Sequence, residues 1–197
     1  LQRRSDGLGS RATKKGIACA LDVADAKALG CGQANQNSDI GGLVDLLMAP
    51  LASGGCVIAT GGFNAPLFFQ LLGERKPTWF QGVPTTLNEL VIHARNNSIS
   101  ARPSSLRLVR SVAAALAPKL MGELEDLFGL PVIQTFGMTE AGPLISSTAL
   151  PPAVRKPGSV GRSCGTEIRI VGPKGQSLPK GETGEVGIRG DNVFRGY

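Results

Sequence analysis

Apolar positions along residues 41–136 recur in two alternating patterns, a helical spacing and short continuous runs. The helical spacing predicts helices over residues 43–51, 64–72, 84–95 and 118–128. The short runs between them predict strands over residues 56–60, 78–82, 106–112 and 130–136. Because strands that alternate with helices usually lie parallel in one sheet, the pattern predicts an α/β fold with a mainly parallel sheet flanked by helices.

Residues with known positional preferences mark the ends of two of these helices. Asn64 can cap the helix that follows it, with Pro66 in the first turn. Gly129 and Pro131 end the helix that begins at Pro118. These signals support the assignment of both segments as helices.

The pattern changes on either side of this region. Residues 167–171 and 185–189 alternate polar and apolar side chains and are joined through glycine turns, which predicts a small antiparallel β subdomain. Residues 1–39 lack sustained apolar periodicity apart from Ile17–Leu21. The sequence thus predicts three parts: a poorly ordered or divergent segment over 1–39, an α/β unit over 40–156 and a β-rich subdomain over 157–197.

Composition is that of a globular chain and indicates no membrane span. The 197 residues are 42% hydrophobic and 18% charged, which is enough apolar content for a core. The apolar region Leu43–Ala59 is interrupted by Asp45 and Pro50, so it is too short to cross a bilayer. Arg3 and Arg4 are followed by polar residues instead of a signal-peptide core, and we therefore expect a cytoplasmic location.

Cysteine and histidine usage argues against zinc and against a disulfide framework. The four cysteines are widely scattered without a C-x-x-C pair, which favours reduced thiols. His93 is the single histidine, which leaves little for a metal site or a Ser-His-Asp triad. We expect His93 on a helix surface.

The net charge of +6 is concentrated at the N-terminus. Five basic residues and one acidic residue give +4 within the first fifteen positions. Such a segment can bind nucleic acid or an anionic surface, or it can be a solvated terminus. No aromatic residue interleaves with these charges, so the solvated terminus is favoured and no nucleic-acid partner is expected.

The densest set of chemical groups follows the strand predicted over residues 130–136. A ring, a glycine, a hydroxyl and a carboxylate stand close together at Phe136, Gly137, Thr139 and Glu140. Ligands bind beyond the carboxyl ends of strands in open α/β sheets, and glycine lets backbone approach them closely. A hydroxyl can hydrogen-bond a phosphate oxygen, and a carboxylate can hold Mg²⁺. The alternative is an ordinary strand exit with a polar tip.

Five segments of the chain resemble the signatures of a known family. Residues 136–140, F-G-M-T-E, are similar to its Y-G-M-T-E signature, and residues 110–116 are similar to its S-G-A-A-P-L adenine loop. Residues 155–162, 181–190 and 195–197 resemble further signatures downstream. From about residue 41 to its end, the chain is identified as a fragment of the large N-terminal domain of the AMP-forming acyl-CoA synthetase and ligase family.

The resemblance implies a two-step reaction. A carboxylate substrate attacks the α-phosphate of ATP to give an acyl-adenylate and pyrophosphate, and a thiol, usually that of coenzyme A, then displaces AMP. The implied cofactors are ATP, Mg²⁺ and coenzyme A. The leading hypothesis is therefore an acid–CoA ligase for a fatty or other small carboxylic acid.

The resemblance also assigns roles to residues of this chain. Thr139 and Glu140 would be catalytic, with Thr139 on the α-phosphate and Glu140 holding Mg²⁺. Ala113 and Ala114 would contact adenine through backbone atoms, and Phe136 would place its ring beside it. The other implied nucleotide-binding residues are Gln134, Thr135, Gly137 and Met138.

Several positions depart from the family pattern. Phe136 keeps the ring of the usual tyrosine and loses its hydroxyl, while Val112 and Ala115 replace a glycine and a proline of the adenine loop. If Asp39 takes the place of a histidine that lines the acyl site, a carboxylate faces the carboxylate substrate. Residues 8–17 partly resemble the family's phosphate loop, so a working loop, a degraded remnant and unrelated sequence all stay open.

The resemblance places the family's ribose-binding aspartate, its hinge and its lid with the adenylation lysine beyond Tyr197. We expect this chain alone to turn over slowly or not at all, since a lost cation costs on the order of several kcal/mol. Gly41–Leu47 and Trp79–Thr85 would furnish an apolar acyl pocket, or would serve equally well as core. The alternatives are an adenylation domain that loads a carrier-protein thiol and a non-catalytic nucleotide-binding remnant. The sequence specifies neither the acyl length nor the oligomeric state.

Overall fold

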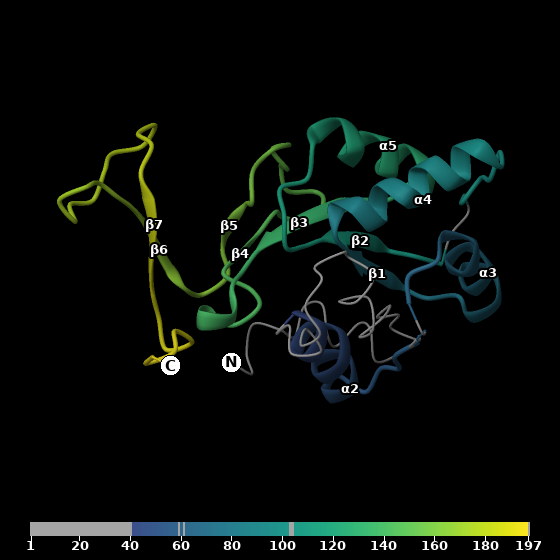
Figure 1. The fold of residues 1–197 in the computed structure, drawn as a ribbon, viewed down its shortest axis with the longest axis horizontal. Helices are drawn as coiled ribbons and strands as arrows, with labels where there is room; N and C mark the ends of the chain where they lie inside the picture. Colours follow the sequence, from purple (N-terminus) through teal and green to yellow (C-terminus); the bar gives the residue numbers. More distant parts are fainter. Residues whose placement is uncertain (1–40, 59, 61, 103–104, 197) are drawn as a thin grey trace.

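The computed structural model describes residues 41–58, 60, 62–102 and 105–196, and its fold is drawn in Figure 1. The possible phosphate loop at residues 8–17 lies outside the described residues, as does Asp39. The basic N-terminal segment and two of the four cysteines lie outside them too. The predictions made at those positions therefore stay predictions.

A five-stranded mixed sheet forms the centre of the fold (Figure 1). Strands β1 (Trp79–Gly82), β2 (Leu108–Ser111) and β3 (Val132–Phe136) run parallel in chain order. Two short strands extend the sheet: β4 (Ser146–Ser147) pairs antiparallel with β3, and β5 (Arg162–Ser163) pairs antiparallel with β4. The predicted α/β fold, with its longer strands parallel, is confirmed.

Helices lie on both sides of this sheet (Figure 1). Helices α4 (Pro84–Asn96) and α5 (Pro118–Phe128) connect the parallel strands and lie over one face. On the other side, η1 (Gly41–Met48) continues into α2 (Ala49–Ala52). Helix α3 (Ala65–Arg75) packs at the β1 end of the sheet, where it contacts α4. Within the described part of the chain, no helix is both long and apolar enough to cross a bilayer.

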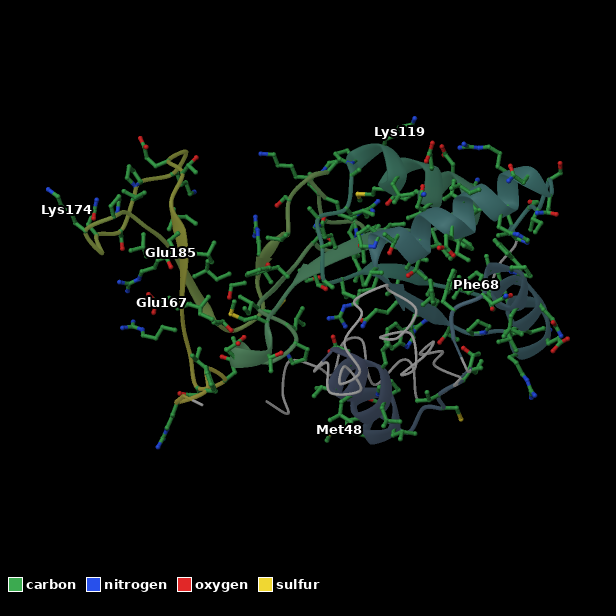
Figure 2. All side chains as sticks on the ribbon, in the orientation of Figure 1. Met48, Phe68, Lys119, Glu167, Lys174 and Glu185 are labelled. Carbon is green, nitrogen blue, oxygen red and sulfur yellow. The ribbon has the colours of Figure 1, made fainter. Side chains whose placement is uncertain are left out.

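The main core lies between the sheet and helices α4 and α5. Phe80, Val109 and Val132 occupy matching positions on three neighbouring strands, so their side chains point to the same face. Phe68 from α3 joins them at 1% exposed, with its ring centroid 4.8 Å from that of Phe80 (Figure 2). The helices contribute further buried residues, among them Leu87, Leu90, Leu124 and Phe128.

The signals at the helix ends are confirmed. Asn64 Oδ1 accepts a hydrogen bond from Leu67 N–H at 2.8 Å, which satisfies a donor in the first turn of α3. Gly129 has a φ of 68°, a left-handed conformation, and ends α5. Helix α5 therefore has the bounds that Pro118 and Gly129 predict.

The prediction of a strand over residues 56–60 is wrong. Residues 56–58 and 60 form no strand. Cys56 is exposed, whereas Ile58 packs against the core from an irregular segment. A short apolar run can bury its side chains without pairing with a strand, so its hydrophobicity does not by itself specify β structure.

His93 lies on α4, as predicted, and is partly exposed. It contacts α3, because the ring of His93 stacks on Phe69 with 5.7 Å between the centroids and 24° between the planes. The histidine thus helps to hold α3 against α4.

Strands β6 (Glu167–Val171) and β7 (Glu185–Arg189) pair as a separate two-stranded antiparallel sheet. Both match the ranges that alternation predicts, and the pair extends away from α4 and α5 (Figure 1). Figure 2 shows Glu167 and Glu185 on this pair, far from Phe68 in the core. Strand β5 belongs to the central sheet, and the predicted division of the chain at residue 157 stays a prediction.

Candidate functional site

The carboxyl ends of β1, β2 and β3 meet at one edge of the sheet. Their register places Gly82 beside Ser111 and Ser111 beside Gln134, and β3 continues to Phe136. The loops after β2 and β3 therefore leave the sheet side by side. Together with the end of β3, these loops hold every residue predicted to bind nucleotide. In open α/β sheets, ligands bind at this edge.

The loop after β2 holds the two alanines predicted to contact adenine. Val112 N–H donates to Gly82 O at 3.2 Å, and Ala114 N–H donates back to Val112 O at 2.8 Å. Ala113, between them, has a φ of 67°. A non-glycine residue in this region is strained, and such strain concentrates at ligand sites. Ala113 and Ala114 are exposed, so carbonyl groups of this loop can accept from the amino group of adenine.

Strand β3 supplies three of the predicted residues, which differ in exposure. Gln134 and Thr135 are buried, at 4% and 6% exposed. Thr135 Oγ1 donates to Ser111 O at 3.4 Å, which ties β3 to β2. Phe136, the last residue of the strand, is half-buried. Gln134 and Thr135 are thus part of the sheet interior, and Phe136 is partly accessible to a ligand.

The chain turns sharply after Phe136. A Cβ atom on Gly137 would lie 2.0 Å from Pro143 O, so only glycine fits there. Ile145 N–H donates to Phe136 O at 2.9 Å and holds the returning chain beside β3. Between these two contacts lies η2 (Thr139–Ala141), a single 3₁₀ turn.

The η2 turn presents a hydroxyl and a carboxylate on adjacent residues just beyond β3. Met138 and Thr139 are exposed and Glu140 is half-buried. Ala141, at 0% exposed, anchors the turn in the interior. The structure thus brings the predicted residues Ala113, Ala114 and 134–140 to one edge, and their roles in binding stay predictions.

The oxygen-bearing side chains of η2 fit Mg²⁺ only together with a phosphate-bearing ligand. Among the residues described, no three or more histidine, cysteine, aspartate or glutamate side chains gather to hold a metal. Mg²⁺ commonly keeps several waters and is bound by one or two carboxylates plus substrate phosphates. The Glu140 carboxylate, next to the Thr139 hydroxyl, matches that pattern.

Two residues from the far end of the chain brace η2. Phe194 N–H donates to Glu140 O at 2.8 Å, and the Asn192 side-chain amide donates to Ala141 O. Asn192 also exchanges hydrogen bonds with Thr166 Oγ1, just before β6. Sequence reasoning missed both Asn192 and Phe194. The available signal was their place between the family-like segments 181–190 and 195–197.

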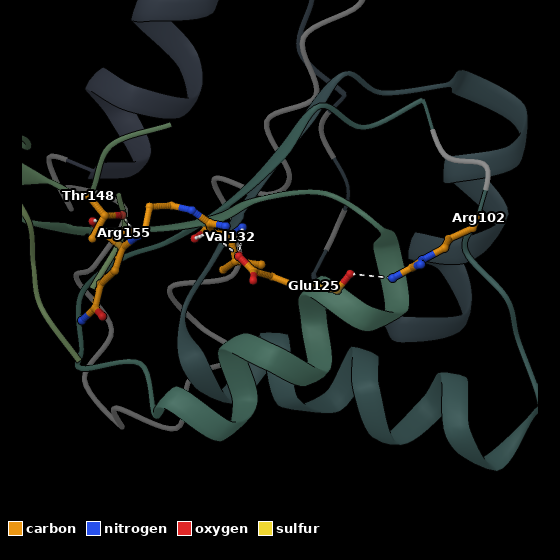
Figure 3. Close-up of polar contacts among 6 residues, drawn as sticks. Arg102, Glu125, Val132, Thr148 and Arg155 are labelled. Carbon is orange, nitrogen blue, oxygen red and sulfur yellow. Dashed lines mark hydrogen bonds and ion pairs between the residues drawn. The ribbon is translucent and has the colours of Figure 1, made fainter. Parts of the chain in front are cut away.

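The start of β3 is fixed by a second network (Figure 3). Arg155 Nη1 donates to Val132 O at 3.1 Å and pairs with the Glu125 carboxylate of α5. That carboxylate accepts from Val132 N–H at 3.0 Å. Arg102 Nη2 donates to Glu125 O at 2.9 Å, near the end of α5. Arg155, the first residue of the family-like segment 155–162, therefore ties α5 to β3.

The opposite face of the sheet is polar near this edge. Arg110 Nη2 lies 2.9 Å from Asp45 Oδ2 of η1, and these side chains are only 13% and 11% exposed. Arg110 Nε also donates to Thr135 Oγ1 at 3.3 Å. Gln81, in the matching position on β1, is 4% exposed. Asp45 and Gln81 lie in the two segments predicted to furnish an apolar acyl pocket, so each segment also carries a polar side chain, and the pocket itself stays a prediction.

A groove of about 410 Å³ opens between α4 and α5, and it is separate from this edge. Val91, Arg95, Glu123 and Leu127 are among its lining residues, and all lie in the later turns of the two helices. Because each helix runs back from the carboxyl edge of the sheet toward the amino edge, the groove lies away from η2.

The AMP-binding enzyme family matches residues 38–197 of this chain. The chain belongs to this family. The matched range includes the loop after β2, the turn from β3 into η2, and the segment that braces η2. Membership in the AMP-binding family agrees with the resemblance seen in the sequence.

Curated relatives from this family are CoA ligases. The chain is 37% identical over 158 residues to sulfoacetate–CoA ligase of Cupriavidus necator. It is 38% identical over 159 residues to oxalate–CoA ligase of Arabidopsis thaliana. These alignments cover 80% and 79% of this chain and only 30% and 31% of the two relatives. The chain therefore spans just under a third of the length of these relatives.

Solved structures of the AMP-binding family share the fold. ATP-bound MatB from Rhodopseudomonas palustris matches with a TM-score of 0.76 at 25% identity, over 98% of this chain and 36% of that protein. The O-succinylbenzoate coenzyme A synthetase of Bacillus subtilis, solved with ATP and a magnesium ion, matches with a TM-score of 0.71 at 25% identity. That match covers 95% of this chain and 36% of the synthetase.

Proposed function

We propose that this chain binds ATP at the η2 edge and takes part in activating a carboxylic acid for transfer to coenzyme A. The observation that supports this most is the tight turn at Gly137, which sets the Thr139 hydroxyl and the Glu140 carboxylate beyond the end of β3. Coenzyme A is preferred to a carrier-protein thiol because the relatives are CoA ligases. The chain spans just under a third of their length, so the whole two-step activity is part of the proposal.

Each part of the edge holds a different part of the nucleotide. Ala113 and Ala114 offer backbone groups to adenine, and Phe136 offers a ring face. The Thr139 hydroxyl donates a hydrogen bond to an oxygen of the α-phosphate. The Glu140 carboxylate would hold Mg²⁺, which supplies positive charge to the phosphate oxygens. Gln134, Thr135, Gly137 and Met138 belong to the strand and turn that keep these groups in place.

The chemistry requires two anions to be brought together. A carboxylate oxygen of the acid bonds to the α-phosphorus while the bond from that phosphorus to pyrophosphate breaks. The thiolate sulfur of coenzyme A then bonds to the acyl carbon, and AMP leaves with the electron pair of the broken C–O bond. Placement of the reactants is the main task of the protein. Because the chain represents under a third of its relatives, we expect it alone to bind ATP and to turn over slowly or not at all.

A small polar acid suits this edge better than the fatty acid expected from the sequence. Gln81 Oε1 is buried and has no hydrogen-bond partner among the described residues. A hydrocarbon chain against Gln81 would leave this buried oxygen unsatisfied, at a cost of about 1–3 kcal/mol. The two relatives named above act on sulfoacetate and oxalate, which are small and polar. We therefore propose a small polar carboxylic acid as substrate.

A thermal-shift titration with Mg-ATP, run beside Glu140→Gln, tests the proposal. Nucleotide at about a hundred times its dissociation constant adds roughly 2.7 kcal/mol of stability, which raises the Tm of a chain this long by roughly 5–10 °C. We expect this shift in the wild type and its loss in the variant. A short dicarboxylate should add a further shift, whereas a long-chain fatty acid should add none. A cooperatively folded sample that ignores Mg-ATP would identify the chain as a non-catalytic remnant.

A further inference from the structure

The side chain of Asn192 joins separate parts of the chain. Its Nδ2 donates to Ala141 O in η2. The same amide meets Thr166 Oγ1, with Nδ2 at 3.0 Å and Oδ1 at 3.2 Å. Thr166 is 3% exposed and comes directly before β6, so it is a fixed point for the amide. Asn192 thereby links η2 to the β6–β7 sheet.

The backbone around Asn192 is shaped to hold this side chain. Val193 N–H donates to Gly190 O at 3.1 Å, which closes a turn. A Cβ atom on Gly190 would lie 2.6 Å from Asn192 Oδ1, so any larger residue there would push the amide away. Glycine at position 190 therefore leaves the space that the Asn192 amide occupies beside η2.

Two successive carbonyl groups of η2 are held by this segment. Phe194 N–H donates to Glu140 O at 2.8 Å, and Asn192 Nδ2 donates to Ala141 O. The next residue, Gly142, has a φ of 74° and can adopt other conformations at little cost. Without the contact from Asn192, the carbonyl of Ala141 would be released and the turn could rotate about Gly142, which would move the backbone that carries Glu140.

We propose that Asn192 is a positioning residue for Glu140: its amide fixes η2 so that the carboxylate meets a metal ion bound to nucleotide phosphates. This inference rests on the proposed nucleotide site. Groups that orient a metal ligand without touching the metal change metal affinity by about 10- to 100-fold when they are removed. Asn192 acts on the backbone of the turn, so its effect on Mg²⁺ passes through the geometry of Glu140.

The dependence of ATP affinity on Mg²⁺ tests this role in the full chain. Isothermal titration gives the dissociation constant of ATP, with and without Mg²⁺, for the wild type and for Asn192→Ala. We expect the variant to bind metal-free ATP within about twofold of the wild type. The factor by which Mg²⁺ increases ATP affinity, called the Mg²⁺ gain, should be about tenfold smaller in the variant than in the wild type. A residue that only stabilises the fold would change both constants together.

Asn64→Ala is the matched control. Asn64 also makes a hydrogen bond from its side chain to backbone, with Leu67 N–H at 2.8 Å. That bond lies at the start of α3, beside the β1 end of the sheet and away from η2 (Figure 1). The gain from Mg²⁺ should be unchanged in this variant. If Asn192→Ala does not fold, Asn192→Ser, whose side chain carries a hydroxyl in place of the amide, replaces it in the comparison.

The outcomes separate the two proposals. A Mg²⁺ gain that falls in Asn192→Ala and not in Asn64→Ala supports the positioning role. A gain that is equal in the wild type and both of these variants overturns the positioning role and leaves the nucleotide site in place. If Mg²⁺ does not increase the ATP affinity of the wild type, and Glu140→Gln binds ATP as the wild type does, the proposed function is overturned and the role of Asn192 with it.

Discussion

The close approach of Gly137 to Pro143 predicts a large effect for a single methyl group. In Gly137→Ala the new Cβ would lie 2.0 Å from Pro143 O and 2.5 Å from its carbonyl carbon. Carbon atoms in contact normally lie about 3.5–4.0 Å apart, so the backbone must move by roughly 1 Å or more. The atoms of Pro143 in this contact are backbone atoms. The two segments that meet there are also held together, because Ile145 N–H donates to Phe136 O at 2.9 Å.

The cost of that movement can be estimated and measured. An added atom that forces the backbone to shift costs about 1–3 kcal/mol, and we expect the upper part of this range because no flexible side chain can yield. Each kcal/mol lowers the Tm of a chain this long by about 2–4 °C, so Gly137→Ala should melt roughly 5–12 °C below the wild type. Circular dichroism during heating measures this difference.

Gly122→Ala in α5 is the matched control for this prediction. A Cβ atom at Gly122 meets no atom within 4 Å, and alanine in a helix should add about 0.5–1 kcal/mol of stability relative to glycine. The two variants should therefore shift Tm in opposite directions. If Gly137→Ala melts with the wild type, the turn is not as tight as the contact distances indicate, and the reasoning is refuted.

Two further variants test the surroundings of the site. Arg155→Ala removes the pair with Glu125, and because these side chains are 19% and 30% exposed, we expect a loss of about 1–2 kcal/mol in urea unfolding; an unchanged midpoint would contradict this. Hydrogen bonds from Arg169 and Arg189 hold the pKa of Glu167 below its usual range. Its contribution to stability is therefore present above the unfolded pKa, about 4.3, and is lost as pH falls through the lower folded value. Glu167→Gln should flatten the acid limb of a stability-against-pH curve, and an unaltered limb would argue against the effect.

Local sequence signals were sufficient for the elements whose ends they mark. Pro118 and Gly129 bound α5, and alternating side chains define β6 and β7, because caps and period-two patterns act within a few residues. The run over 56–60 has a similar apolar content and does not form the predicted strand. Strand formation needs a partner strand, and no local pattern encodes that partner.

The candidate site could be located from the sequence but not completed. A strand predicted over 130–136 was enough to set Thr139 and Glu140 just past a sheet edge. The brace from Asn192 to Ala141 joins residues 51 positions apart, and such a contact leaves no periodic signal. The polar face of the sheet was missed for the same reason, since the partner of Arg110 lies on a distant helix.

Strand β3 is fixed at both ends by residues distant in the sequence. Arg155 holds its first residue through Val132 O, and Asn192 holds the turn that follows it. Mg²⁺-dependent binding can therefore be lost in two ways: the Glu140 carboxylate can be removed, or the turn that carries it can be displaced. Glu140→Gln removes the carboxylate charge and leaves the turn braced, whereas Asn192→Ala keeps the carboxylate and frees the turn. Both variants should weaken Mg²⁺-dependent binding, but Glu140→Gln should melt closer to the wild type, because only Asn192→Ala removes hydrogen bonds that brace the backbone.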